Sequence, residues 1–138
     1  MDIESIEAEY VNYLKEAMPD YEVIAYPDEP MNYKVLNGVG AILVRFDNLT
    51  ADRQNVLGQP TLMQFVIVSI HHNLRSHLGA YQILENIRQT LADKQIGVFK
   101  AYVATQSFLD YINGFWYYET RIMLPGVMAG GVLNLING

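Results

Sequence analysis

Apolar and polar positions repeat with two different periods along this chain of 138 residues. The opening segment, from Ile3 to Ala17, places apolar residues three and four positions apart with acidic residues between them, which predicts an amphipathic helix. Asp2 is positioned to cap its first turn, and Pro19 ends the pattern. A second helical repeat predicts a helix from about Leu78 to Asp93. Two helices are therefore expected.

Two segments in the first half of the chain have the pattern of strands. YEVIAY at 21–26 predicts a short strand. GAILVRFD at 40–47 predicts a second strand, with Ile42, Val44 and Phe46 on one face and Leu43 and Arg45 on the other. The intervening residues 27–38 are rich in proline, asparagine and glycine, which predicts a loop.

The strongest strand pattern lies at 61–71, after a polar connection predicted at 48–60. Both faces of that strand are largely apolar, which is typical of a strand covered on both sides. Two further strands are expected at 98–112 and 115–124. Asn113 and Gly114 join them and favour a type I′ hairpin turn, because both turn positions require positive φ.

The element order α-β-β-β-α-β-β predicts an α+β fold, with a mainly antiparallel sheet of four to five strands and two helices packed on one face. The apolar second face of strand 61–71 then needs another cover, from either another subunit or the C-terminal segment. We expect one domain at 1–124, followed by an apolar, glycine-rich arm at 125–138. That arm docks on its own domain or on the sheet edge of a neighbouring copy.

Composition narrows the classes of function. The chain has no cysteine, which excludes a Cys nucleophile and a thiolate metal site. Residues 1–30 carry a net charge of −8 and the remainder +2, with no run of basic residues, which argues against nucleic-acid binding. An acidic N-terminus and the lack of 18 consecutive apolar residues predict neither a signal peptide nor a membrane span.

All three histidines of the chain, His71, His72 and His77, lie within seven positions. This clustering raises the hypothesis of a metal-dependent hydrolase. However, adjacent residues in a strand point to opposite faces, His77 lies across a turn, and the spacing differs from that of helical zinc motifs. A structural role is favoured, and we expect no enzymatic activity, no catalytic or metal-binding residues and no cofactor.

The junction between strand 61–71 and the second helix carries the most distinctive pattern. Together with the acidic first helix and the aromatic hairpin, it resembles the minor tail proteins of Mu-like phages and prophages, which are grouped with the phage tail terminators. The resemblance runs from about Ile3 to Leu124 and contains no catalytic signature. The residues of the junction pattern are Asn73, Leu74, Arg75, Gly79, Ala80, Tyr81, Ile83, Leu84, Glu85, Ile87, Arg88 and Leu91.

The resemblance implies a structural role as a tail terminator, or tail completion protein. Its implied partners are further copies in a homohexameric ring, the tail-tube protein, the head-neck connector protein and, in a contractile tail, the sheath protein. DNA would pass through the lumen without specific binding, and no membrane would be involved. The implied location is the virion tail, assembled in the cytoplasm of the bacterial host. A different head-tail connector or oligomeric interaction module is the alternative.

A ring requires a head-to-tail interface, and the uneven charge suggests how one could form. We expect the acidic N-terminal part of one copy to meet arginines of the next, and the loops at 27–38 and 48–60 to contact partners. The predicted interface residues are Arg45, Arg53, Asn73, Arg75, His77, Arg88, Val132, Leu133, Leu135 and Ile136.

Overall fold

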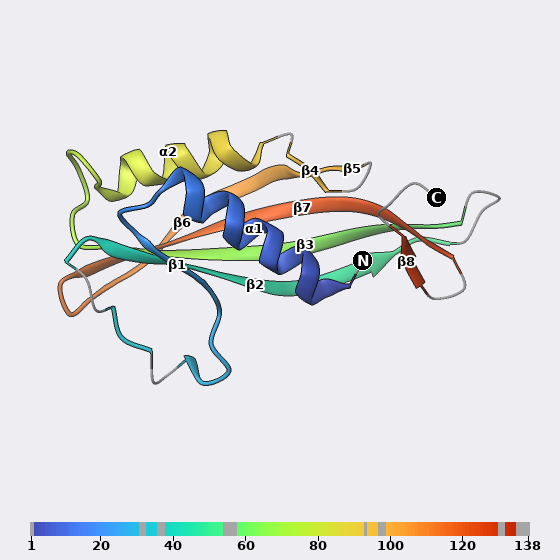
Figure 1. Cartoon of the computed structure of the whole chain (residues 1–138), viewed down its shortest axis with the longest axis horizontal. Helices are drawn as coiled ribbons and strands as arrows, with labels where there is room; N and C mark the ends of the chain where they lie inside the picture. The colour runs from blue at the N-terminus through green and yellow to red at the C-terminus, as the bar shows by residue number, and fades with distance from the viewer. Residues whose placement is uncertain are drawn as a thin grey trace.

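The computed structural model is an elongated α+β domain in which both helices lie against one large sheet (Figure 1). The structure describes residues 2–30, 33–35, 38–53, 58–92, 94–96, 99–129 and 132–134. The elements are α1 (Ile3–Ala17), β1 (Glu22–Ala25), β2 (Gly40–Ala51), β3 (Gln59–His71), α2 (Ala80–Leu91), β4 (Gln95–Ile96), β5 (Phe99–Lys100), β6 (Tyr102–Ile112), β7 (Phe115–Ala129) and β8 (Val132–Asn134).

The main sheet has the strand order β1-β2-β3-β7-β6, with β8 pairing on β7. All its pairs are antiparallel except β1 with β2, which run parallel. The predicted α+β class is therefore confirmed. The sequence pattern did not predict β4 and β5, which form a separate two-stranded sheet before β6.

Both helices bury their apolar stripes on the same face of the sheet, which we call the helix face. Asp2 caps α1 as predicted, its carboxylate accepting a hydrogen bond of 2.8 Å from the Ser5 amide. From α1 come Ile6, Tyr10 and Leu14, and from α2 come Ile83, Ile87 and Leu91. The sheet contributes Ile42, Val44, Met63, Phe65, Ile67, Ile122 and Leu124 to the same cluster.

The other side of the sheet, which we call the open face, has a smaller apolar cluster of Leu43, Val66, Val68 and Ile70. Residues after β1 cover part of it: Tyr26, Tyr33 and Val35 pack there, on the loop that projects below the sheet in Figure 1. Of the C-terminal segment considered as a cover from the sequence, Leu133 packs on the helix-face core instead, and cover by another subunit stays a prediction.

Strands enter the predicted polar loop at 48–60 from both of its ends. β2 continues to Ala51 and β3 begins at Gln59. The pairing shifts by one residue between Phe46 and Asn48, which marks a β-bulge at Asp47. The polar residues after Asp47 favour a loop by composition, and the bulge reverses the alternation of faces, so periodicity does not reveal the rest of the strand.

The last long strand also extends beyond its predicted end. β7 passes Leu124 and pairs with β3 as far as Met128, so the expected start of the arm at 125 falls inside a strand. Pro125 has no amide N–H to donate to a neighbouring strand. It is tolerated because the pairing of β6 with β7 ends at Met123, so β6 needs no hydrogen bond from position 125. β8 then folds back on β7. Leu135 and Ile136 lie outside the described residues.

Candidate interaction surface

The β6–β7 hairpin forms one end of the sheet. Asn113 and Gly114 have φ values of 54° and 85°, which confirms the predicted turn with positive φ at both positions. β6 is an edge strand, and its pairing with β7 shifts between Val103 and Thr105 and again between Phe108 and Asp110. Phe108, Leu109, Tyr111 and Ile112 are each between 44% and 53% exposed, so this edge presents large apolar side chains to solvent.

On the helix face, the hairpin and the start of α2 form an aromatic patch. Ring centroids lie 4.5 Å apart for Tyr111 and Trp116, and 5.6 Å apart for Phe108 and Tyr118. The Arg75 guanidinium lies 5.6 Å from the centre of the exposed Tyr81 ring, which places a positive charge beside the patch. The aromatic patch consists of Tyr81, Phe108, Tyr111, Trp116 and Tyr118.

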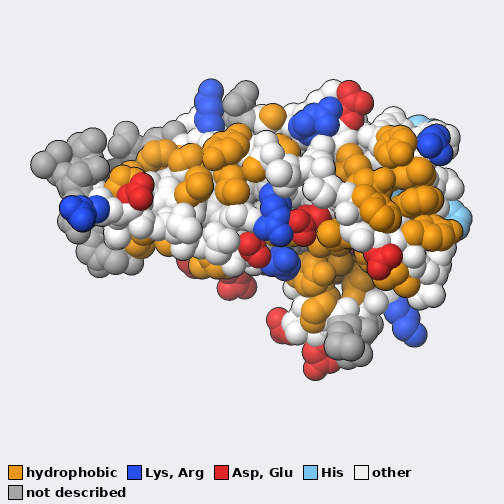
Figure 2. All heavy atoms as spheres, turned by 180° about the vertical axis from the view of Figure 1, so that it is seen from behind, with side chains coloured by type: hydrophobic (Ala, Val, Ile, Leu, Met, Phe, Trp, Pro, Cys, Tyr) orange, Lys and Arg blue, Asp and Glu red, His pale blue; other side chains and the backbone are white. Residues whose placement is uncertain are grey.

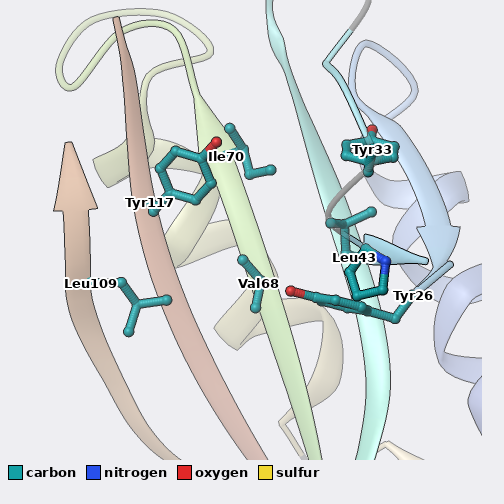
Figure 3. Close-up of a pocket in the computed structure, with 8 residues that line it drawn as sticks. Tyr26, Tyr33, Leu43, Val68, Ile70, Leu109 and Tyr117 are labelled. Carbon is teal, nitrogen blue, oxygen red and sulfur yellow. The ribbon is translucent and has the colours of Figure 1, made fainter. Parts of the chain in front are cut away.

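On the open face, the same hairpin borders a hollow of about 200 Å³. Figure 3 shows Leu109 and Tyr117 on one side of it and Tyr26 and Tyr33 on the other, with strand residues between them. Asp28, which is exposed, lies between the lining residues Tyr26 and Pro30 in the sequence, and the Arg45 guanidinium lies 5.9 Å from the centre of the Tyr26 ring. The lining residues are Tyr26, Pro30, Tyr33, Leu43, Val68, Ile70, Leu109 and Tyr117.

Beyond the hollow, the middle of the open face carries a chain of ion pairs. Asp47 lies 2.9 Å from Arg45 and 3.4 Å from Arg121, and Arg121 lies 2.7 Å from Glu119. Figure 2 shows acidic and basic side chains side by side there, with hydrophobic groups gathered toward the hairpin end. Arg45 pairs with Asp47 of its own chain, and its contact with a neighbouring copy stays a prediction.

The three histidines are separated by the fold. His71 is buried on the helix face, where its ring packs near Tyr118, whereas the exposed His72 packs against Phe115 on the open face. His77 is exposed in the turn between β3 and α2. Within the part of the chain that the structure describes, no three histidine or acidic side chains are placed to hold a metal ion.

His71 instead takes part in a buried hydrogen-bond chain. The Tyr21 hydroxyl lies 2.8 Å from His71 Nδ1 and donates to the Leu78 carbonyl at 2.8 Å. Because the single hydroxyl proton goes to Leu78, His71 Nδ1 carries the proton that the Tyr21 oxygen accepts. Burial lowers the pKa of His71 to about 3. The contact fixes the β3–α2 turn on the helix face and leaves the ring neutral.

The tight geometry of the β3–α2 turn has a packing origin. A Cβ on Gly79 would lie 2.3 Å from the Arg75 carbonyl oxygen, so only glycine fits. The amides of Ala80 and Tyr81 donate to the carbonyls of Asn73 and Leu74 at 2.8 Å and 3.1 Å. The junction pattern of the sequence therefore describes a tight turn that leads into a helix.

The remaining predicted interface residues are scattered. Asn73, Arg75 and His77 are exposed together on the β3–α2 turn, near the aromatic patch. Arg88 donates to Gln106 at 3.0 Å and ties α2 to β6. Arg53 is exposed at the far end, beyond β2.

Sequence reasoning missed the exposed side of β6. Phe108 and Leu109 are adjacent and apolar, as are Tyr111 and Ile112, and adjacent strand residues face opposite sides. Two adjacent apolar residues in an edge strand place one apolar side chain on each face of the sheet. These pairs could therefore have indicated an interaction surface on both faces.

A protein-family model, that of the Gp37 protein, matches residues 10–128, from the middle of α1 almost to the end of β7. The chain belongs to the Gp37 protein family. Gp37 is a phage-type family, so this Gp37 protein is phage-related, and a place in the virion is compatible with that membership. No curated protein matches this Gp37 protein.

The family membership confirms the phage origin expected from the sequence, while the tail terminator role stays a prediction. Neither helix in the described residues of this Gp37 protein combines the length and the apolar character needed to cross a bilayer.

Proposed function

We propose that this Gp37 protein is a tail terminator, a structural protein that assembles into a ring on the end of the tail tube. The observation that supports this role best is the edge strand β6, which exposes Phe108, Leu109, Tyr111 and Ile112. An exposed apolar edge strand is a liability in a monomer, because it invites uncontrolled association. A protein that works within an assembly covers such an edge with its neighbours.

The proposed mechanism involves no bond-making chemistry. A ring seated on the last ring of tube subunits buries their polymerising surface, so growth stops by occlusion. The other side of the ring remains available to the head-neck connector and, in a contractile tail, to the sheath. The elongated shape of the domain supports this division, because its two ends lie far apart along the strands (Figure 1).

The acidic α1 supplies a surface suited to a DNA channel. Asp2, Glu4 and Glu16 are exposed on or beside this helix, and Lys15 is its only basic residue. Carboxylates repel phosphates at close range, so DNA would slide past such a wall without binding to it. We propose that α1 faces the lumen.

A test of the function uses the tail-tube protein encoded by the same phage. Tube protein polymerised with an excess of this Gp37 protein should give shorter tubes than tube protein alone, by electron microscopy of negatively stained samples. Gold-labelled Gp37 protein added to finished tubes should bind only at tube ends. Unchanged tube lengths, or label spread along tube walls, would overturn the proposal. A connector of the neck would leave tube length unchanged, so the same assay separates the two roles.

A further inference from the structure

We infer that neighbouring copies dock head to tail through the two faces of the β6–β7 hairpin, with the aromatic patch of one copy seated over the hollow of the next. This inference rests on the proposed ring and names the surface that closes it. The hairpin exposes apolar side chains in opposite directions, Phe108 and Tyr111 toward the helix face and Leu109 toward the open face.

The two-sided exposure decides the symmetry of the contact. An isologous dimer buries the same patch on both copies, so it would cover one face of the hairpin and leave the other in water. A heterologous contact buries the aromatic patch of one copy and the hollow of another at the same time. Repeated around a closed rotation, it covers both faces of every hairpin, as a ring requires.

Charge disfavours the pairing of two aromatic patches. Arg75 lies 5.6 Å from the centre of the Tyr81 ring, so docking patch to patch would bring the Arg75 of one copy toward the Arg75 of the other. Like charges across an interface cost free energy and select against the wrong pairing.

The size of the hollow favours a side chain of another copy over a small molecule. Pockets for ligands usually enclose about 300–1,000 Å³, and this one measures about 200 Å³. Its lining is mainly apolar, with tyrosines at its border, which suits an aromatic side chain. Phe108 and Tyr111, each about half exposed, are the side chains of the patch available to enter it.

Two single variants test the direction of the contact. Phe108→Glu disables the patch and leaves the hollow intact, and Leu109→Glu does the reverse. By native mass spectrometry, wild type should form closed oligomers, and each variant alone should stay at 15.7 kDa. Mixed in equal amounts, the variants should form a 1:1 heterodimer and nothing larger, because only one good contact remains. Thr105→Glu, exposed on the same strand, is the matched control and should assemble like wild type.

Several results would overturn the inference: a wild-type monomer at every concentration, dimers of Leu109→Glu alone, or a mixture that stays monomeric. Loss of assembly in Thr105→Glu would also overturn it. If a variant fails to fold by circular dichroism, Phe108→Ser and Leu109→Ser replace the pair, since both side chains are about half exposed. Each should weaken assembly when alone, and their equal mixture should again give only the heterodimer. Rings that survive these changes and still cap tubes would leave the terminator function standing without this interface.

Discussion

The two faces of the sheet have similar apolar character but different covers. β3 places Met63, Phe65 and Ile67 on the helix face, where two helices seal them from water. Its alternate residues, Val66 and Val68, lie on the open face with the loop residues Tyr26 and Tyr33, the hollow and a row of partly exposed ion pairs. Apolar alternation therefore identifies the surfaces that must be buried, without saying whether the same chain or another copy buries them. We interpret the helix face as the core and the hairpin end of the open face as an interface.

The largest expected effect is a difference in the free energy of unfolding between substitutions on the two faces. Phe65 is fully buried and its ring lies 5.2 Å from that of Tyr10, so Phe65→Ala should lower the free energy of unfolding by about 3–5 kcal/mol. Tyr117→Ala on the open face should cost less than half of that, since its side chain is partly exposed. Urea denaturation of both variants measures the difference. Equal losses would contradict the assignment of the core to the helix face.

The next effect is a dependence of stability on pH, which we expect from His71 on the helix face. Burial lowers the pKa of His71 to about 3, below its ordinary value of 6.5. As the pH falls below 6.5, His71 takes up a proton in the unfolded chain but not in the folded one. The contribution of the neutral His71 ring to the free energy of unfolding is therefore complete above pH 6.5 and is lost progressively toward pH 3. The loss is about 1.4 kcal/mol per pH unit, or about 2 kcal/mol at pH 5.

Urea denaturation of wild type and His71→Leu at pH 7, 6 and 5 measures this contribution. The stability of wild type relative to the variant should fall by about 2 kcal/mol over that range. His72→Leu is the matched control, because it removes the neighbouring histidine, whose ring is exposed. A His71→Leu variant with the same pH dependence as wild type would show that the buried ring does not carry it.

The smallest expected effect is a gain in stability. The Tyr10 hydroxyl is buried with no hydrogen-bond partner in the described residues, and burial raises its pKa. Tyr10→Phe should therefore stabilise the fold by about 1 kcal/mol, because it removes an unsatisfied polar group and keeps the ring. Tyr26→Phe, partly exposed on the open face, should be neutral. Thermal denaturation compares the two, and a destabilised Tyr10→Phe would indicate a hydrogen bond to this hydroxyl.

Most of the helices and strands could be predicted from local sequence patterns. Residue spacing predicted α1 with its Asp2 cap, and Asn113-Gly114 predicted the hairpin turn, because each depends on residues close in sequence. The bulge at Asp47 could not be predicted from periodicity, since it follows from pairing with a distant strand. The contact between Tyr21 and His71 joins residues 50 positions apart.

The interface residues predicted from the sequence only partly coincide with the surface proposed from the structure, and they stay a prediction. Arg75 lies beside the aromatic patch as part of an exposed turn, but Arg45 is paired within its own chain. Exposure of Phe108 and Leu109 depends on β6 being the last strand of the sheet, which strand order decides and local sequence does not. In a central strand, the same apolar side chains would be expected in the buried core.

The absence of cysteine from the chain allows a direct test of head-to-tail docking by disulfide cross-linking. One variant carries both Tyr111→Cys in the aromatic patch and Pro30→Cys at the hollow, and two others carry one change each. Under mild oxidation, the double variant should give a ladder of covalent oligomers on a non-reducing gel. Each single variant should remain monomeric, and their mixture should give dimers only. Efficient cross-linking of a single variant with itself, or a double variant that stays monomeric, would contradict the assignment of the two hairpin faces to one repeating interface.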